Sequence, residues 1–139
     1  MIFCQSTLVQ VAKTALATAM MAALVACGDP KYQPPAIVVT FFSPPPTALN
    51  TGSTTGLTAV VANDPGSGNV IWTCTPINAC GTFNPTTIHT NVPTCYQAPG
   101  NVPPTNPVTV TATSVGDSTK SASATITISS GAPDVTCAP

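Results

Sequence analysis

Cysteine is the residue type in this chain best placed to do chemistry. Of the 6 cysteines in the 139 residues, four lie in the second half, at Cys74, Cys80, Cys95 and Cys137. Their spacings of 6, 15 and 42 residues do not fit the close Cys-x-x-Cys pairs that structural zinc prefers, so a zinc site is disfavoured. An even number of cysteines in an exported protein instead indicates disulfides, and four cysteines allow three pairings.

The local sequence favours one of these pairings. Thr75-Pro76-Ile77-Asn78-Ala79 has the composition of a turn, which would bring Cys74 and Cys80 together. Closing this loop would add roughly 2.4 kcal/mol to the free energy of unfolding in the chain-entropy model. The second bond, Cys95–Cys137, then follows by elimination and would fix the C-terminal segment to a sheet.

The chain has few ionisable side chains for an acid–base enzyme. It contains 1 His, 4 Asp and 3 Lys, with no Glu and no Arg. His89 lies in the polar segment 84–91, where we expect an exposed loop, and no motif identifies partners for it in a catalytic triad. Asp64 and Asp117 lie in turn segments, where Asp commonly bonds to the nearby backbone, and no Asp-x-Asp cluster indicates calcium. The sequence therefore predicts no catalytic residue, no metal and no cofactor.

The charge content disfavours further classes of protein. Only 5% of the residues are charged, and the formal net charge is −1. A nucleic-acid partner is not expected, because neutralising phosphates needs clustered Lys and Arg, and no such cluster exists. A long charged coiled coil is excluded by the absence of Glu- and Lys-rich heptads. Disorder usually combines low hydrophobicity with high net charge, whereas 43% of this chain is hydrophobic.

The first 26 residues differ in composition from the rest of the chain. They contain no Pro and no Gly, whereas 16 Pro and 9 Gly follow. The apolar run 15–26 is interrupted only by Thr18 and is shorter than the roughly 20 residues that a membrane-spanning helix needs. Residues 1–26 are therefore predicted to be a helical secretory signal peptide.

The end of this segment carries a more specific motif. Leu24-Val25-Ala26-Cys27 resembles the lipobox of bacterial lipoproteins, in which the cysteine is acylated and becomes the mature N-terminus. The resemblance implies a lipid anchor on Cys27, a Pro-rich tether over 27–36 and a location in the bacterial cell envelope. Gly28 follows the cysteine where lipoproteins retained at the inner membrane have Asp, so we expect the outer membrane. The alternatives are a generic signal peptide with an incidental cysteine, or an uncleaved anchor.

The mature chain has the pattern of an all-β domain. Val108–Thr113 and Ala122–Ile128 alternate small or apolar residues with hydroxylated ones, and the turn residues 114–120 between them predict an antiparallel hairpin. Further strands are predicted at 37–42, 57–61, 70–74, 81–83 and 94–97. About seven short strands in roughly 100 residues indicate an antiparallel β-sandwich.

Several strand motifs resemble a known family. Val70-Ile71-Trp72, Cys80-Gly81-Thr82-Phe83, Tyr96-Gln97-Ala98-Pro99 and the Thr-rich hairpin are similar, in this order, to the bacterial immunoglobulin-like (Big-type) domains of cell-surface and adhesin proteins. The resemblance covers residues 37–129 and leaves 130–139 as a C-terminal tail. It implies an immunoglobulin-like sandwich at the cell surface and no catalytic residues. The cysteines depart from the commonest members.

Two aromatic residues are expected in the core of this sandwich. Trp72 shares one strand face with Val70 and Cys74, which the alternation places inward. Tyr96 is predicted to be its second large core residue. The residues facing Trp72 are predicted to be aliphatic: Leu57, Ala59, Val61, Val110 and Ala112.

Two hypotheses for function follow. The first is a non-enzymatic, lipid-anchored envelope module with a structural, adhesion or protein-docking role. The alternative is an envelope-anchored domain that binds glycans or peptides through the end loops 62–69 and 115–120, or through an exposed sheet edge. An enzyme is not expected.

Overall fold

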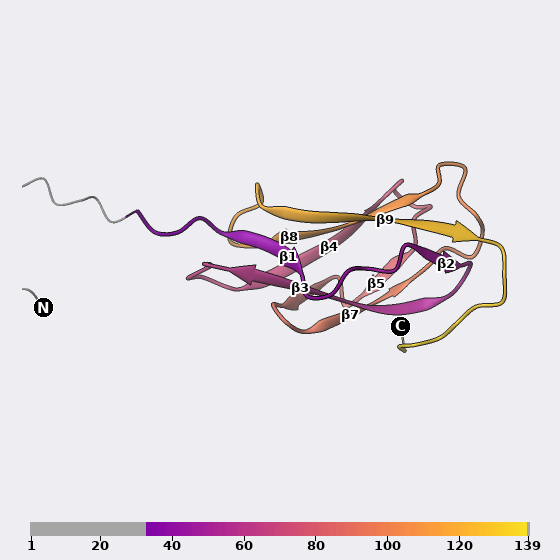
Figure 1. Cartoon of the computed structure of the whole chain (residues 1–139), viewed down its shortest axis with the longest axis horizontal. Coiled ribbons are helices and arrows are strands. Elements are labelled where there is room, and N and C mark those ends of the chain that lie inside the picture. Colours follow the sequence, from indigo (N-terminus) through magenta and orange to yellow (C-terminus); the bar gives the residue numbers. More distant parts are fainter. Residues whose placement is uncertain (1–32, 139) are drawn as a thin grey trace, which may run out of the picture. The chain divides into compact units, whose positions relative to one another are not determined.

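The structure is a computed structural model that describes residues 33–138. The predicted signal peptide (1–26), the predicted acylation site Cys27 and tether residues 28–32 lie outside the described residues. The described part of the chain is all-β, with nine strands in two sheets and no helix (Figure 1). Nine strands exceed the predicted seven because two three-residue strands, β2 and β6, were missed.

The strands form a four-stranded and a five-stranded sheet. The first has the order β1 (Val38–Phe41), β3 (Thr54–Ala62), β7 (Pro93–Gln97) and β5 (Thr82–Asn84). The second has the order β2 (Ala48–Asn50), β9 (Ser121–Ser129), β8 (Val108–Ser114), β4 (Asn69–Thr75) and β6 (Thr87–His89). The predicted hairpin is β8–β9, which pairs Val108 with Ile126 and Thr113 with Ser121. One pair departs from the predicted antiparallel sandwich, since β2 lies parallel to β9.

The two missed strands arise where the chain passes from one sheet to the other. β1 pairs with β3 in the first sheet, and the following strand β2 pairs with β9 in the second. In the same way β5 pairs with β7, and β6 pairs with β4 in the opposite sheet. Each crossing contains proline, in Pro44-Pro45-Pro46 and at Pro85. Proline cannot donate to a ladder and therefore favours the end of pairing at these points.

One hydrophobic core lies between the two sheets. Trp72 is 2% exposed and Tyr96 is fully buried. The five residues expected around Trp72 are buried as well, but the surroundings are more aromatic than predicted. The Trp72 ring lies 6.1 Å from Phe41 on β1 and 5.7 Å from Phe83 on β5, and Phe83 lies 5.0 Å from Tyr96. β1 and β5, the strands that precede the two crossings, thus carry aromatic rings to the core.

Candidate functional site

The four described cysteines form two disulfides. Cys74 is bonded to Cys80 and Cys95 to Cys137, with Cα–Cα distances of 5.8 and 5.9 Å. This is the pairing that the turn sequence favours. The first bond closes the loop between β4 and β5, and the second joins β7 to the C-terminal segment.

Tyr96 fixes the first of these loops to the core. Its hydroxyl donates a hydrogen bond to the carbonyl of Cys80. Burial of the phenol raises the pKa of Tyr96 to about 12. The side chain therefore stays neutral at physiological pH and acts as a buried hydrogen-bond donor.

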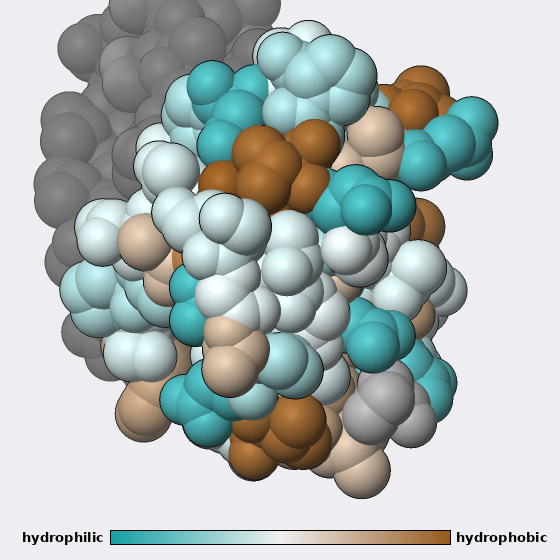
Figure 2. Space-filling view, turned by 90° about the vertical axis from the view of Figure 1, so that its right-hand side faces the viewer, coloured by the Kyte–Doolittle hydropathy of each residue, from teal (hydrophilic) through white to brown (hydrophobic). Residues whose placement is uncertain are grey.

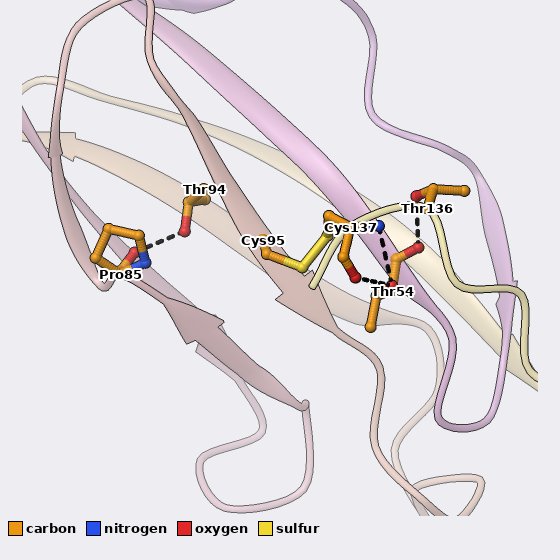
Figure 3. The surroundings of a disulfide bond; sticks show 6 residues. All are labelled: Thr54, Pro85, Thr94, Cys95, Thr136 and Cys137. Carbon is orange, nitrogen blue, oxygen red and sulfur yellow. Dashed lines mark hydrogen bonds between the residues drawn. A yellow bond between two sulfur atoms is a disulfide. The ribbon is translucent and has the colours of Figure 1, made fainter. Parts of the chain in front are cut away.

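The C-terminal segment is an additional partner for β3, as Figure 3 shows. Val135 forms a parallel bridge with Thr54, and the Thr54 amide donates to the Asp134 carbonyl at 2.8 Å. The Thr54 hydroxyl donates to the Cys137 carbonyl at 2.8 Å, and the Thr136 hydroxyl donates to the Thr54 carbonyl at 2.7 Å. Residues 134–137 therefore pair with the edge of β3 and are also linked to β7 through Cys95.

A cleft of about 590 Å³ lies between β4 and β5, beside the other disulfide. Its walls include Thr73 and Cys74 from β4, Ile77 from the loop, and Cys80 and Phe83. No Asp, Lys or His side chain lines it. The cleft is therefore largely apolar, and the half-buried Cys74 and the buried Cys80 form part of its wall. Sequence reasoning missed it because it depends on which strands pair, although the apolar Ile77 in a turn was a visible signal.

The predicted end loops lie together at the end of the domain where the described chain begins. The Val115 amide donates to the Asn69 carbonyl at 2.9 Å, which joins the loop after β3 to the loop after β8. Asp64 accepts hydrogen bonds from the amides of Gly66 and Gly68, at 2.9 and 3.1 Å. The Asn63 side chain donates to the Ala36 carbonyl at 3.0 Å, so the segment leading into β1 is fixed to the same end.

His89, Asp64 and Asp117 each make contacts with residues close to them in the sequence. His89 was expected in a loop but ends strand β6, where it is exposed, with Nδ1 3.2 Å from the Thr90 carbonyl oxygen. The hydroxyl and amide of Thr119 donate to the Asp117 carboxylate and lower its pKa. Asp64 and Asp117 thus bond to their own turns, as Asp commonly does.

Two kinds of feature are absent from residues 33–138. No group of three or more His, Cys, Asp or Glu residues in that range could hold a metal ion. In the same range, no helix is long and apolar enough to cross a membrane.

The opposite end of the domain, at which β9 finishes, is seen in Figure 2. Its visible surface is mostly pale or polar, with separate apolar patches rather than one continuous apolar face. Among the exposed apolar side chains are Ile77, 78% exposed, in the loop after β4, and Val135, 66% exposed, in the C-terminal segment.

Comparison of the chain with protein-family models, with curated proteins and with solved structures finds no match.

Proposed function

We propose that this protein is a non-enzymatic, lipid-anchored module of a bacterial cell envelope, with Cys27 as the acylated residue. The observation that carries the proposal is Leu24-Val25-Ala26-Cys27, which follows an apolar segment and precedes a domain with two disulfides. Disulfides persist in oxidising compartments outside the cytoplasm, so they support export. Gly28 after the cysteine supports the outer membrane rather than the inner one.

An immunoglobulin-like arrangement of the sandwich forms part of this proposal. In immunoglobulin domains, strands A, B, E and D form one sheet and C, F and G the other, with a buried Trp on strand C. The order β1-β3-β7-β5 matches the first sheet, and β9-β8-β4 matches the second. Trp72 lies on β4, which has the position of strand C. The disulfides differ, because neither joins the two strands that an antibody domain connects.

The length of the proposed tether limits how far the domain would lie from the membrane. Residues 33–36 lead into β1 at the end that carries Asn63. A ten-residue tether over 27–36 spans at most roughly 33–36 Å. The domain would therefore stay near the bilayer.

Replacement of Cys27 tests the anchor. In the Cys27→Ala variant we expect loss of acyl labelling and release of the protein from the membrane fraction, because the thiol that carries the lipid is absent. Cys4→Ala is the matched control. It should keep acyl labelling and membrane association, because Cys4 lies outside the Leu24-Val25-Ala26-Cys27 motif. Acyl labelling that persists in Cys27→Ala would contradict the proposal.

The position after the cysteine gives an independent test of sorting. Gly28→Asp should leave acyl labelling intact and move the protein from the outer-membrane to the inner-membrane fraction on a density gradient. An unchanged distribution would contradict the outer-membrane location while leaving the anchor itself supported.

A further inference from the structure

We propose that the cleft between β4 and β5 binds an extended, uncharged peptide segment of another protein, which adds to the free edge of β4 at Cys74. The inference deepens the docking role proposed above and rests on it for the identity of the partner as an envelope protein. The binding chemistry itself is argued from the domain alone.

The free edge exists because β6 covers only part of β4. The ladder between them pairs Asn69 to Ile71 with His89 to Thr87, and the Trp72 amide then donates to the Thr86 carbonyl at 2.8 Å. Beyond this point the pairing ends, since residues 82–84 lie in the opposite sheet. Backbone groups of alternate residues point to the same side of an antiparallel strand, so the N–H and C=O of Cys74 point where those of Trp72 do.

Nothing in residues 33–138 occupies this edge at Cys74. No hydrogen bond to the Cys74 amide or carbonyl is found there, and the β8 ladder takes the groups on the other side of β4. Unpaired strand edges are sites at which a further chain can add a strand.

The same domain shows how an extended segment fills such an edge. At its first residues β3 does not pair with β1, because the register between these two strands covers only Ala59–Ala62 of β3. Residues 134–136 fill the vacant place by bonding to the amide and carbonyl of Thr54. The crossing from β5 to β6 leaves β4 in the equivalent situation, and no segment among the described residues 33–138 fills that place. An added peptide would complete β4 as the C-terminal segment completes β3.

The walls of the cleft determine the chemistry of the peptide. Phe83, Ile77 and the Cys74–Cys80 disulfide supply apolar surface beside the free backbone groups. Charged side chains are absent from the lining, so an ion in the cleft would have no partner there. The best occupant is a peptide with apolar side chains at alternate positions, because alternate residues of a strand face the same side.

The cleft lies at one end of the domain, beside backbone groups of β4 that a peptide strand can bond and a lipid chain cannot. β4 runs in the same direction as β9, since both are antiparallel to β8, and the cleft lies at the end where both finish. The described chain begins at the opposite end, beside Asn63. The cleft and the first described residues therefore lie at opposite ends of the domain.

The test uses the full-length protein in detergent and a displayed library of random ten-residue peptides. We expect enrichment of uncharged peptides with alternating apolar residues. Ile77→Asp places a charge at the mouth of the cleft at a highly exposed position, so the fold should persist and binding of a selected peptide should weaken at least about tenfold. Val135→Asp, on the opposite edge of the sandwich, is the matched control and should change affinity by less than about twofold.

Amide hydrogen exchange locates the bound peptide. The Cys74 amide should exchange more slowly with peptide present, whereas the Trp72 amide, already bonded to Thr86, should change little. The proposal is overturned by failure to enrich peptides, by binding that Ile77→Asp leaves intact, or by unchanged exchange at Cys74. Protection of Cys74 in a concentration-dependent dimer, or competition by a glycan alone, would assign another occupant and also overturn it.

These outcomes are separable from those of the anchor. Cys27→Ala protein should bind a selected peptide as the parent does, because the cleft lies in the folded domain. Loss of acylation with retained peptide binding is expected for that variant. Absence of peptide binding in the parent would refute the cleft while leaving the acylation result standing.

Discussion

Trp72→Ala is the substitution that most directly tests the packing of this domain. Removal of a buried Trp side chain costs about 3–5 kcal/mol in transfer and cavity energy. The neighbouring rings of Phe41 and Phe83, at 6.1 and 5.7 Å, each add about 0.5–1.5 kcal/mol that the variant would also lose.

An opposing contribution comes from the indole nitrogen. Trp72 Nε1 is buried and has no hydrogen-bond partner within residues 33–138. An unsatisfied buried donor costs about 1–3 kcal/mol, which the alanine variant no longer bears. This gain roughly cancels the lost aromatic contacts, so the expected net loss stays at about 3–5 kcal/mol.

Urea unfolding followed by far-ultraviolet circular dichroism measures this loss. Tryptophan fluorescence cannot follow the unfolding of this variant, because the chain contains 1 Trp and the substitution removes it. For a domain of this size we expect the Tm to fall by more than about 10 °C. Ile77→Ala, at a position 78% exposed, is the control and should change stability by less than about 0.5 kcal/mol.

A second variant separates the two contributions at this site. Trp72→Phe keeps an aromatic ring between Phe41 and Phe83 but removes the unpaired N–H, so it should be much less destabilising than the alanine variant. If Trp72→Ala unfolded at the same urea concentration as the parent, the inward orientation of β4 would be wrong. Equal losses for both variants would instead refute the account of the unpaired nitrogen.

The disulfides and Tyr96 give the remaining predictions. Replacing both Cys95 and Cys137 with Ser should lower the free energy of unfolding by about 4 kcal/mol, because the bond joins residues 42 apart. The same replacement of Cys74 and Cys80, 6 residues apart, should cost about 2.4 kcal/mol, and urea unfolding midpoints measure both losses. Non-reducing peptide mapping checks the pairing, and a Cys74–Cys95 peptide would refute it. The pKa of Tyr96 is raised to about 12 from 10.0 in the unfolded chain, so its contribution is fully present below pH 10 and is lost as the pH rises toward 12. Tyr96→Phe should flatten this alkaline decline, and an unaltered decline would show that another group causes it.

Most of the strands were predictable because their pattern is local. β8 alternates buried and partly buried residues without interruption, as its sequence of Val, Thr and Ala indicates. β2 and β6 were not predictable in this way. Each has three residues, follows a proline and pairs with a strand that no local signal identifies. Their partners are set by the crossing between sheets, which is a property of the assembled sandwich.

The surroundings of Trp72 show the same limit. Its inward orientation follows from the alternation around it, and its burial was expected on that ground. Phe41 and Phe83 were not assigned to it, although both are large apolar residues on predicted strands. Their contact requires β1 and β5, which lie at opposite edges of one sheet, to cover the same side chain of the other sheet. The cleft was missed for a related reason. It lies beside the part of β4 that β6 does not pair with, and this gap exists because β5, the strand before β6, pairs with β7 in the opposite sheet.

The two disulfides lie beside strand ends that lack a neighbouring strand, where they can limit fraying of the sheets. At the end where β9 finishes, β3 and β4 each lack a neighbouring strand over part of their length. Cys137 holds the segment that completes β3, and Cys80 holds the loop that follows the unpaired part of β4. A covalent bond limits fraying of a strand end by restricting the open ensemble, and it leaves the backbone groups of the edge unoccupied. The bond at Cys74 can therefore keep an edge ordered and vacant at once, which is the condition that strand addition by a partner requires.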